Sequence, residues 1–194
     1  MRREAPSGRI AAMEFEPTAL PEVVVLRPRI HVDERGYLIE SFHAGEFAAA
    51  GLPSRFVQEN TSFSHQGTLR GLHYQLHLAQ GKIVQTVAGA IFDVAVDIRR
   101  SSPTFGRWVA VELSADNGRQ IWIPSGFAHG LYTLTADATV VYRLTEHYAP
   151  QWERSLRWDD PQLAIEWPLV GGRPPRLSPR DASAPLLAGA EVYA

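Results

Sequence analysis

The stretch Asp93-Val94-Ala95-Val96-Asp97-Ile98 decides the fold class, because its charged and apolar residues alternate. Successive side chains of an extended chain point to opposite faces, so an alternating pattern of this kind predicts a β-strand. Similar short runs recur along the chain, and glycine and proline separate them. Runs of this kind with turn residues between them are typical of sandwiches and barrels. The expected strands cover residues 23–26, 36–42, 83–87, 91–98, 108–113, 120–123, 130–134 and 139–144.

Helical signal is thin in this chain. The best candidate covers residues 45–50, which are rich in alanine and are followed by Gly51 and Pro53. We therefore predict an all-β fold, a single antiparallel sandwich of the double-sheet jelly-roll kind with a few short helices. One domain is expected over residues 13–194, with a proline-rich C-terminal tail over 171–190. Residues 1–12 are expected to form a flexible N-terminal extension.

Composition excludes several classes of function. The chain has 194 residues, a formal net charge of −2 and no cysteine. It therefore has no disulfide, thiol nucleophile or cysteine-ligated metal, and it lacks the basic excess of a general nucleic-acid binder. No apolar run is long enough to cross a membrane, and the cytoplasm is the expected compartment. Of the 19 basic residues, Lys82 alone is a lysine.

Four segments are unusually polar for their hydrophobic setting, and inward-facing polar groups on a sandwich would line a cavity. They cover residues 33–36, 58–75, 80–82 and 123–130. The pattern Pro124-x-Gly126-x-x-His129 is similar to the second half of the cupin signature, whereas His73-Tyr74-Gln75 lacks one histidine of the first half. A metal site built from His73, His129 and a third group such as His77 stays open as an alternative. We expect a metal-free site that uses histidine for acid–base work.

Further motifs make the resemblance specific. Over about residues 14–190, the chain resembles the dTDP-4-dehydrorhamnose 3,5-epimerase family, a group of metal-free cupin sugar-nucleotide epimerases. The matching stretches are Asp33-Glu34-Arg35-Gly36, Leu69-Arg70-Gly71-Leu72-His73-Tyr74-Gln75, Gln80-Gly81-Lys82, residues 92–99 and 102–106, Trp122-Ile123-Pro124-x-Gly126-Phe127-Ala128-His129-Gly130, and Ile165-Glu166-Trp167-Pro168.

The resemblance implies proton transfer at C3 and C5 of dTDP-4-dehydro-6-deoxy-D-xylo-hexose, whose ketone acidifies both positions. No cofactor is implied. His73 matches the family's general base, which suits an imidazole, and Asp181 matches the carboxylate that orients it. Tyr142 matches the acid on the opposite face, and Lys82 matches a cation beside the enolate oxygen. For an isolated residue of each type a structural role would be the commoner one.

The resemblance also implies a substrate-binding set and a homodimer that exchanges N-terminal strands. The chain departs from the family pattern at His147, where an aromatic is common, and at Arg180, where lysine is usual. Asp93 is a candidate for supporting the active site. The implied substrate-binding residues are Arg35 and Glu40 from the neighbouring subunit, and Gln58, Asn60, Arg70, His129, Tyr148 and Glu153.

Two alternatives remain at this stage. An epimerase that inverts only C3 or only C5 would need the same catalytic set. A metal-dependent or merely sugar-binding cupin would share the fold. The implied product of the leading hypothesis is dTDP-4-dehydro-L-rhamnose, and neither nucleic acid nor a membrane is an expected partner.

Overall fold

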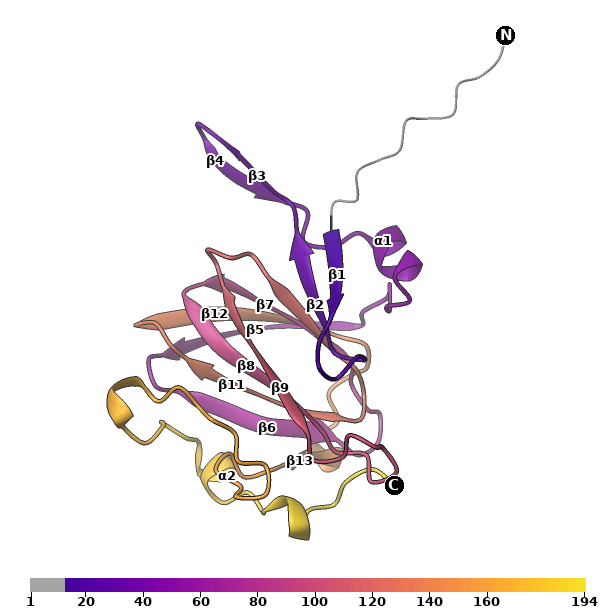
Figure 1. The fold of residues 1–194 in the computed structure, drawn as a ribbon, viewed down its shortest axis with the longest axis vertical. Helices are drawn as coiled ribbons and strands as arrows, with labels where there is room; N and C mark the ends of the chain where they lie inside the picture. The colour runs from indigo at the N-terminus through magenta and orange to yellow at the C-terminus, as the bar shows by residue number, and fades with distance from the viewer. Residues whose placement is uncertain (1–12) are drawn as a thin grey trace.

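The computed structural model describes residues 13–194, and the expected extension over 1–12 lies outside the described residues. Two antiparallel sheets pack face to face (Figure 1). The six-stranded sheet has the order β1-β2-β10-β7-β12-β5, and the five-stranded sheet has the order β13-β6-β11-β8-β9. The strands of the first sheet are β1 (Met13–Pro17), β2 (Val24–Pro28), β10 (Gln120–Ile123), β7 (Lys82–Ala88), β12 (Asp137–Leu144) and β5 (Gln58–His65). Those of the second are β13 (Glu153–Ser155), β6 (Leu69–Gln75), β11 (Phe127–Thr133), β8 (Ala90–Asp97) and β9 (Trp108–Ser114).

The remaining elements are short. A hairpin of β3 (Ile30–Asp33) and β4 (Gly36–Ile39) projects away from the sandwich (Figure 1). Helix α1 (Ala44–Ala49) falls within one residue of its expected place and buries Phe47. Two further helical turns, η1 (Pro150–Trp152) and η2 (Val170–Gly172), precede α2 (Pro179–Ala182) and η3 (Leu187–Gly189). In residues 13–194, no helix combines the length and apolar character that a membrane crossing requires. The two antiparallel sheets and the few short helices confirm the expected all-β sandwich.

Strand β8 shows why its alternating sequence matters. Val94 and Val96 point to the outer face of the five-stranded sheet, where they pack with Trp167 and Leu187 of the C-terminal segment. Ala95 points the other way, into the core between the sheets. Asp93 shares the face of Ala95, because side chains two apart lie on the same side. A fully buried carboxylate therefore points between the sheets.

The C-terminal segment is an integral layer of the fold. It covers the outer face of the five-stranded sheet with Leu156, Leu163, Trp167, Leu187 and Ala190, all of them buried. Backbone hydrogen bonds join it to β6, from the Leu69 amide to the Arg176 carbonyl and between Leu72 and Leu156. The tail expected from its prolines is thus fixed against the strand that carries His73.

Candidate active site

A cavity of about 1040 Å³ lies between the two sheets. Strands β5, β7 and β12 form one wall, β6, β11 and β13 form the other, and α2 closes one side. Its volume suits a ligand of nucleotide-sugar size, since small-molecule sites span roughly 300–1,000 Å³. The structure brings His73, Lys82, His129, Tyr142, Asp181 and the implied binding residues Asn60, Arg70, Tyr148 and Glu153 into its lining.

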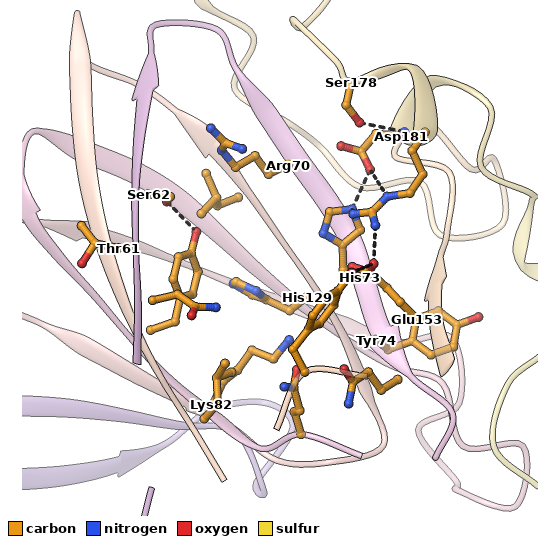
Figure 2. A pocket seen from close by; sticks show the side chains of 18 of the residues that line it. Thr61, Ser62, Arg70, His73, Tyr74, Lys82, His129, Glu153, Ser178 and Asp181 are labelled. Carbon is orange, nitrogen blue, oxygen red and sulfur yellow. Dashed lines mark hydrogen bonds and ion pairs between the residues drawn. The ribbon is translucent and has the colours of Figure 1, made fainter. Parts of the chain in front are cut away.

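His73 lies on β6, paired in register with His129 on β11. The strands approach closely at Gly71, where a Cβ atom would lie 2.5 Å from the carbonyl oxygen of His129. His73 Nε2 lies 2.6 Å from Asp181 Oδ1. An ionised carboxylate only accepts hydrogen bonds, so this shorter contact places the proton on Nε2 and the lone pair on Nδ1. Arg180 Nη2 lies 3.0 Å from the same Nε2, and because a guanidinium only donates, it competes with Asp181 for that nitrogen. The ring stands between Asp181 and the cavity, which leaves Nδ1 free to take a proton (Figure 2).

Local sequence places Asp181 for this contact. Ser178 is the N-cap of α2, its hydroxyl accepts from the Asp181 amide, and Pro179 occupies the first turn. These are the residues preferred at helix starts. Burial would raise the pKa of Asp181, but the hydrogen bond from His73, together with its charge, and the Ser178 hydroxyl lower it below the ordinary value. The carboxylate therefore stays ionised beside the imidazole.

His129 forms a second pair, with Nε2 2.8 Å from Asp93 Oδ2. Both side chains are deeply buried, with 6% of His129 and none of Asp93 exposed. Burial lowers the pKa of His129, although the charge of Asp93 opposes this. The ring is therefore neutral near pH 7. Its Nε2–H bond to Asp93 holds it in one orientation and leaves Nδ1 as an acceptor.

Lys82 begins β7 and is buried, and Figure 2 shows its ammonium group pointing into the cavity. Gly81 permits this placement, because a Cβ there would lie 2.3 Å from the Trp122 ring. Burial lowers the pKa of Lys82 to about 8, and the charges of Asp93 and Glu153 partly restore it. A compact cation whose charge is poised near neutral pH therefore sits beside the two histidines.

Tyr142 stands on β12, in the sheet opposite His73. Its ring centre is 6.0 Å from that of His129, and its hydroxyl lies 3.1 Å from Ser62 Oγ on β5. Burial raises the pKa of Tyr142 to about 12. The phenol is therefore protonated at neutral pH and faces the cavity from the wall opposite the imidazole of His73.

The rest of the lining is polar and interconnected. Arg70 Nε donates to Ser64 Oγ at 2.9 Å, which holds the guanidinium along the cavity. Tyr148 donates its hydroxyl to Glu153 at 2.6 Å, and Glu153 also forms an ion pair with Arg180. Gln58 lies behind this wall, where its Oε1 accepts from the Tyr148 amide. These contacts fix the side chains that would meet the nucleotide.

Arg35 and Glu40 do not reach the cavity within one chain. Arg35 is in the β3–β4 turn and pairs with Asp33 at 2.5 Å. Glu40 follows β4 at the base of the same hairpin. The two residues would have to meet a substrate in a different copy of the chain.

The residues in the cupin metal positions do not suit a metal. Gln75 stands where a metal cupin carries a second histidine, and its amide group is engaged by the backbone of Leu78, His147 and Ala149. His77 packs edge-on against Trp152 at 4.2 Å. Within residues 13–194, no three histidine, aspartate or glutamate side chains gather as a metal-binding group.

Sequence reasoning overlooked Ser62 and Ser64. Both lie on β5, a strand that was not expected because its apolar residues are few. The alternation of Asn60, Ser62 and Ser64 was the available signal, since it places three polar side chains on one face. Strands β1, β3, β6 and β13 were likewise not among the expected strands.

Comparisons with known proteins identify the family of the chain. A family model described as dTDP-4-dehydrorhamnose 3,5-epimerase matches residues 17–189. The enzyme of that name from Salmonella typhimurium is 50% identical over 172 residues, covering 88% of this chain and 93% of the relative. A crystal structure of dTDP-6-deoxy-D-glucose-3,5-epimerase from Legionella pneumophila, in complex with dTDP-4-keto-L-rhamnose, has a TM-score of 0.89 and 51% identity, covering 92% and 95% of the chains.

A solved 3'-monoepimerase from Streptomyces bikiniensis, in complex with dTDP-quinovose, is also similar, with a TM-score of 0.84 and 39% identity. The match covers 89% of this chain and 87% of the solved chain. The resemblance read from the sequence motifs is confirmed, and with it the enzyme class, an isomerase of sugar nucleotides. The chain belongs to the dTDP-4-dehydrorhamnose 3,5-epimerase family.

Proposed function

We propose that the protein inverts C3 and C5 of dTDP-4-dehydro-6-deoxy-D-xylo-hexose, giving dTDP-4-dehydro-L-rhamnose in dTDP-L-rhamnose biosynthesis. The observation that carries the proposal is the opposition of two proton-transfer groups across one cavity. His73, backed by Asp181 at 2.6 Å, faces it from one sheet, and Tyr142 faces it from the other. Inversion requires removal of a proton from one face of a carbon and return of a proton to the opposite face.

His73 Nδ1 removes the proton next to the C4 ketone, and Asp181 stabilises the imidazolium that forms. The electron pair moves onto the ketone oxygen and gives an enolate. The Lys82 ammonium lies where it can stabilise that oxygen, and a fixed charge in a buried site is more effective than one in water. His129 is neutral and donates Nε2–H to Asp93, so its Nδ1 can accept a hydrogen bond from a sugar hydroxyl. Tyr142 then donates its phenolic proton to the opposite face of the same carbon.

The nucleotide would lie along the polar remainder of the cavity. Arg70 offers a planar pair of donors to the pyrophosphate. Tyr148, Glu153 and Asn60 line the route to the base and sugar, and Gln58 supports Tyr148 from behind. The same kind of ligand occupies the similar Legionella pneumophila structure, which holds dTDP-4-keto-L-rhamnose.

A homodimer with exchanged N-terminal strands completes the proposed site. The β3–β4 hairpin exposes 76% of Val32, 64% of Tyr37 and 66% of Leu38, an unusual apolar surface for a projecting hairpin. Insertion of this hairpin against a second copy would cover these side chains and carry Arg35 and Glu40 to the partner's cavity. Leu38→Glu should yield a monomer of low activity in analytical ultracentrifugation and assay. An active monomer would contradict the proposal.

The cytoplasm is the proposed compartment, which cell fractionation tests directly. Residues 13–194 are proposed to work as a single domain, and limited proteolysis should leave this unit intact.

The activity test follows the sugar by NMR. The protein is incubated with dTDP-4-dehydro-6-deoxy-D-xylo-hexose in deuterated buffer, and the configuration and deuterium content of C3 and C5 are read from the product. We expect inversion and deuterium at both carbons. Absence of both would refute an epimerase.

A monofunctional epimerase is the second candidate, because the similar Streptomyces bikiniensis structure is a 3'-monoepimerase. The same spectra distinguish it, since inversion would then be confined to one carbon.

A further inference from the structure

Strand β5 carries a row of polar side chains on one face, two of which, Asn60 and Ser62, line the cavity, and each has a different partner. Side chains alternate along a strand, so Asn60, Ser62 and Ser64 share one face. Gln58 donates to Asn60, Ser62 contacts the Tyr142 hydroxyl, and Ser64 accepts from Arg70. One strand thus supports both the group implied to donate a proton and the group implied to bind phosphate.

The Ser62 contact follows from the sheet register. Val140 on β12 pairs with Ser62, and Tyr142 pairs with Asn60. Ser62 and Tyr142 are therefore diagonal neighbours, close enough for a long side chain to reach across. The dashed line from Ser62 in Figure 2 marks the resulting 3.1 Å hydrogen bond, which lies at the cavity wall.

Either oxygen can donate in this bond, and the chemistry selects one direction. If Tyr142 donated to Ser62, its only proton would point away from the substrate. If Ser62 donates, the phenolic proton is free to point into the cavity. The same donor then stabilises the phenolate left after proton transfer, which burial otherwise disfavours.

We propose that Ser62 is a positioning residue for the acid: it donates a hydrogen bond to Tyr142, directs the phenolic proton at the substrate and stabilises the phenolate. This inference rests on the proposed epimerase function.

The proton balance closes through the same bond. Tyr142 gives its proton to the carbanion and becomes a phenolate. Ser62 passes its hydroxyl proton to the phenolate oxygen while it accepts one from water. The hydroxide that remains is neutralised by the proton that His73 took from the opposite face and releases to solvent. The half-buried side chain of Ser62, on an edge strand, suits such a route.

The test separates Ser62 from its neighbour Ser64. In deuterated buffer, Ser62→Ala should lower kcat about tenfold and leave KM within about twofold of the wild-type value. The reason is that the variant loses one hydrogen bond to the acid, and such a loss corresponds to roughly a tenfold change in rate. Proton removal by His73 continues, so substrate that has exchanged without inverting should accumulate relative to product. Ser62→Thr keeps the hydroxyl and should retain the wild-type ratio of exchange to inversion. Ser64→Ala should instead raise KM through Arg70 and leave that ratio unchanged.

A double-mutant cycle with Tyr142→Phe gives the stricter readout. Ser62→Ala should have no further effect on the residual activity of Tyr142→Phe, because its hydrogen-bond partner is already gone. An equal loss in both backgrounds, or an unchanged exchange ratio in Ser62→Ala, would overturn the inference while the wild-type enzyme remains an epimerase. A wild type that neither exchanges nor inverts would refute the proposed function itself, and the inference with it.

Discussion

The cavity contains two histidine–aspartate pairs with similar bonds and different exposure. His73 and Asp181 are 2.6 Å apart, and 25% of the histidine side chain is exposed. His129 and Asp93 are 2.8 Å apart, and only 6% of that histidine is exposed. Burial favours the neutral imidazole. A base must also exchange its proton with solvent each turnover, which the more open pair allows. Burial, rather than the carboxylate partner, therefore separates the histidine proposed as the base from the histidine held as a fixed neutral ring.

The same substitution in each pair should give the largest contrast. His73→Asn should lower kcat by about 10³-fold or more, because it removes the base. His129→Asn should lower it about tenfold, since this residue contacts the sugar but takes no proton from carbon. Initial rates with a coupled reductase measure both. Equal losses in the two variants would erase the proposed distinction.

The next largest loss of activity is expected at Asp181, the aspartate of the more exposed pair. Asp181→Asn should lower kcat about 10²-fold with little change in KM, because an amide no longer fixes the Nε2–H tautomer or stabilises the imidazolium. Circular dichroism provides the control that α2 remains docked. A variant with wild-type kcat would show that His73 needs no carboxylate.

Lys82 links the two pairs and should set an alkaline limit. Its pKa in the folded protein is lowered to about 8, so the ammonium is present below that pH and is lost above it. We therefore expect kcat/KM to fall as the pH rises through about 8. Lys82→Arg should lose this limb, because arginine stays charged, and should be slower at pH 7, since a broad guanidinium fits the enolate oxygen poorly. Full activity in this variant would contradict a need for a compact cation.

The smallest effect is expected from the buried aspartate. Asp93 raises the pKa of both Lys82 and His129 by its charge. Asp93→Asn should therefore shift the alkaline limb of kcat/KM to lower pH, with a loss of less than about tenfold at pH 7. A matched pH profile of the wild type is the reference. A limb that stays in place would show that Asp93 does not act through Lys82.

The core strands and the cavity strands were predictable to different degrees. Val94, Val96 and their counterparts in other core strands alternate with residues of the opposite face, so these strands could be found from periodicity. Strands β5 and β6 could not, because they carry polar side chains inward to form the cavity. The C-terminal segment lacks periodicity, and its docking depends on contacts with Leu69 and Leu72 of β6, which are distant in sequence.

The site was predictable mainly through its motifs. His73, Lys82 and His129 stand in dense polar stretches, whereas Asp181 lies 108 residues from His73 and no spacing rule joins them. Ser178 and Pro179 are residues preferred at a helix start, but the four-residue helix that positions Asp181 was not among the expected elements. The hydrogen bond between Ser62 and Tyr142 depends on the register between β5 and β12. The two residues are 80 positions apart, and sequence alone does not supply that register.

The most direct measurement is deuterium uptake at C3 and C5 by the His73→Asn and His129→Asn proteins, followed by NMR over long incubations with excess enzyme. We expect that His129→Asn still exchanges both positions at a measurable rate and that His73→Asn exchanges neither. Exchange by His73→Asn at the wild-type rate would show that another group removes the proton.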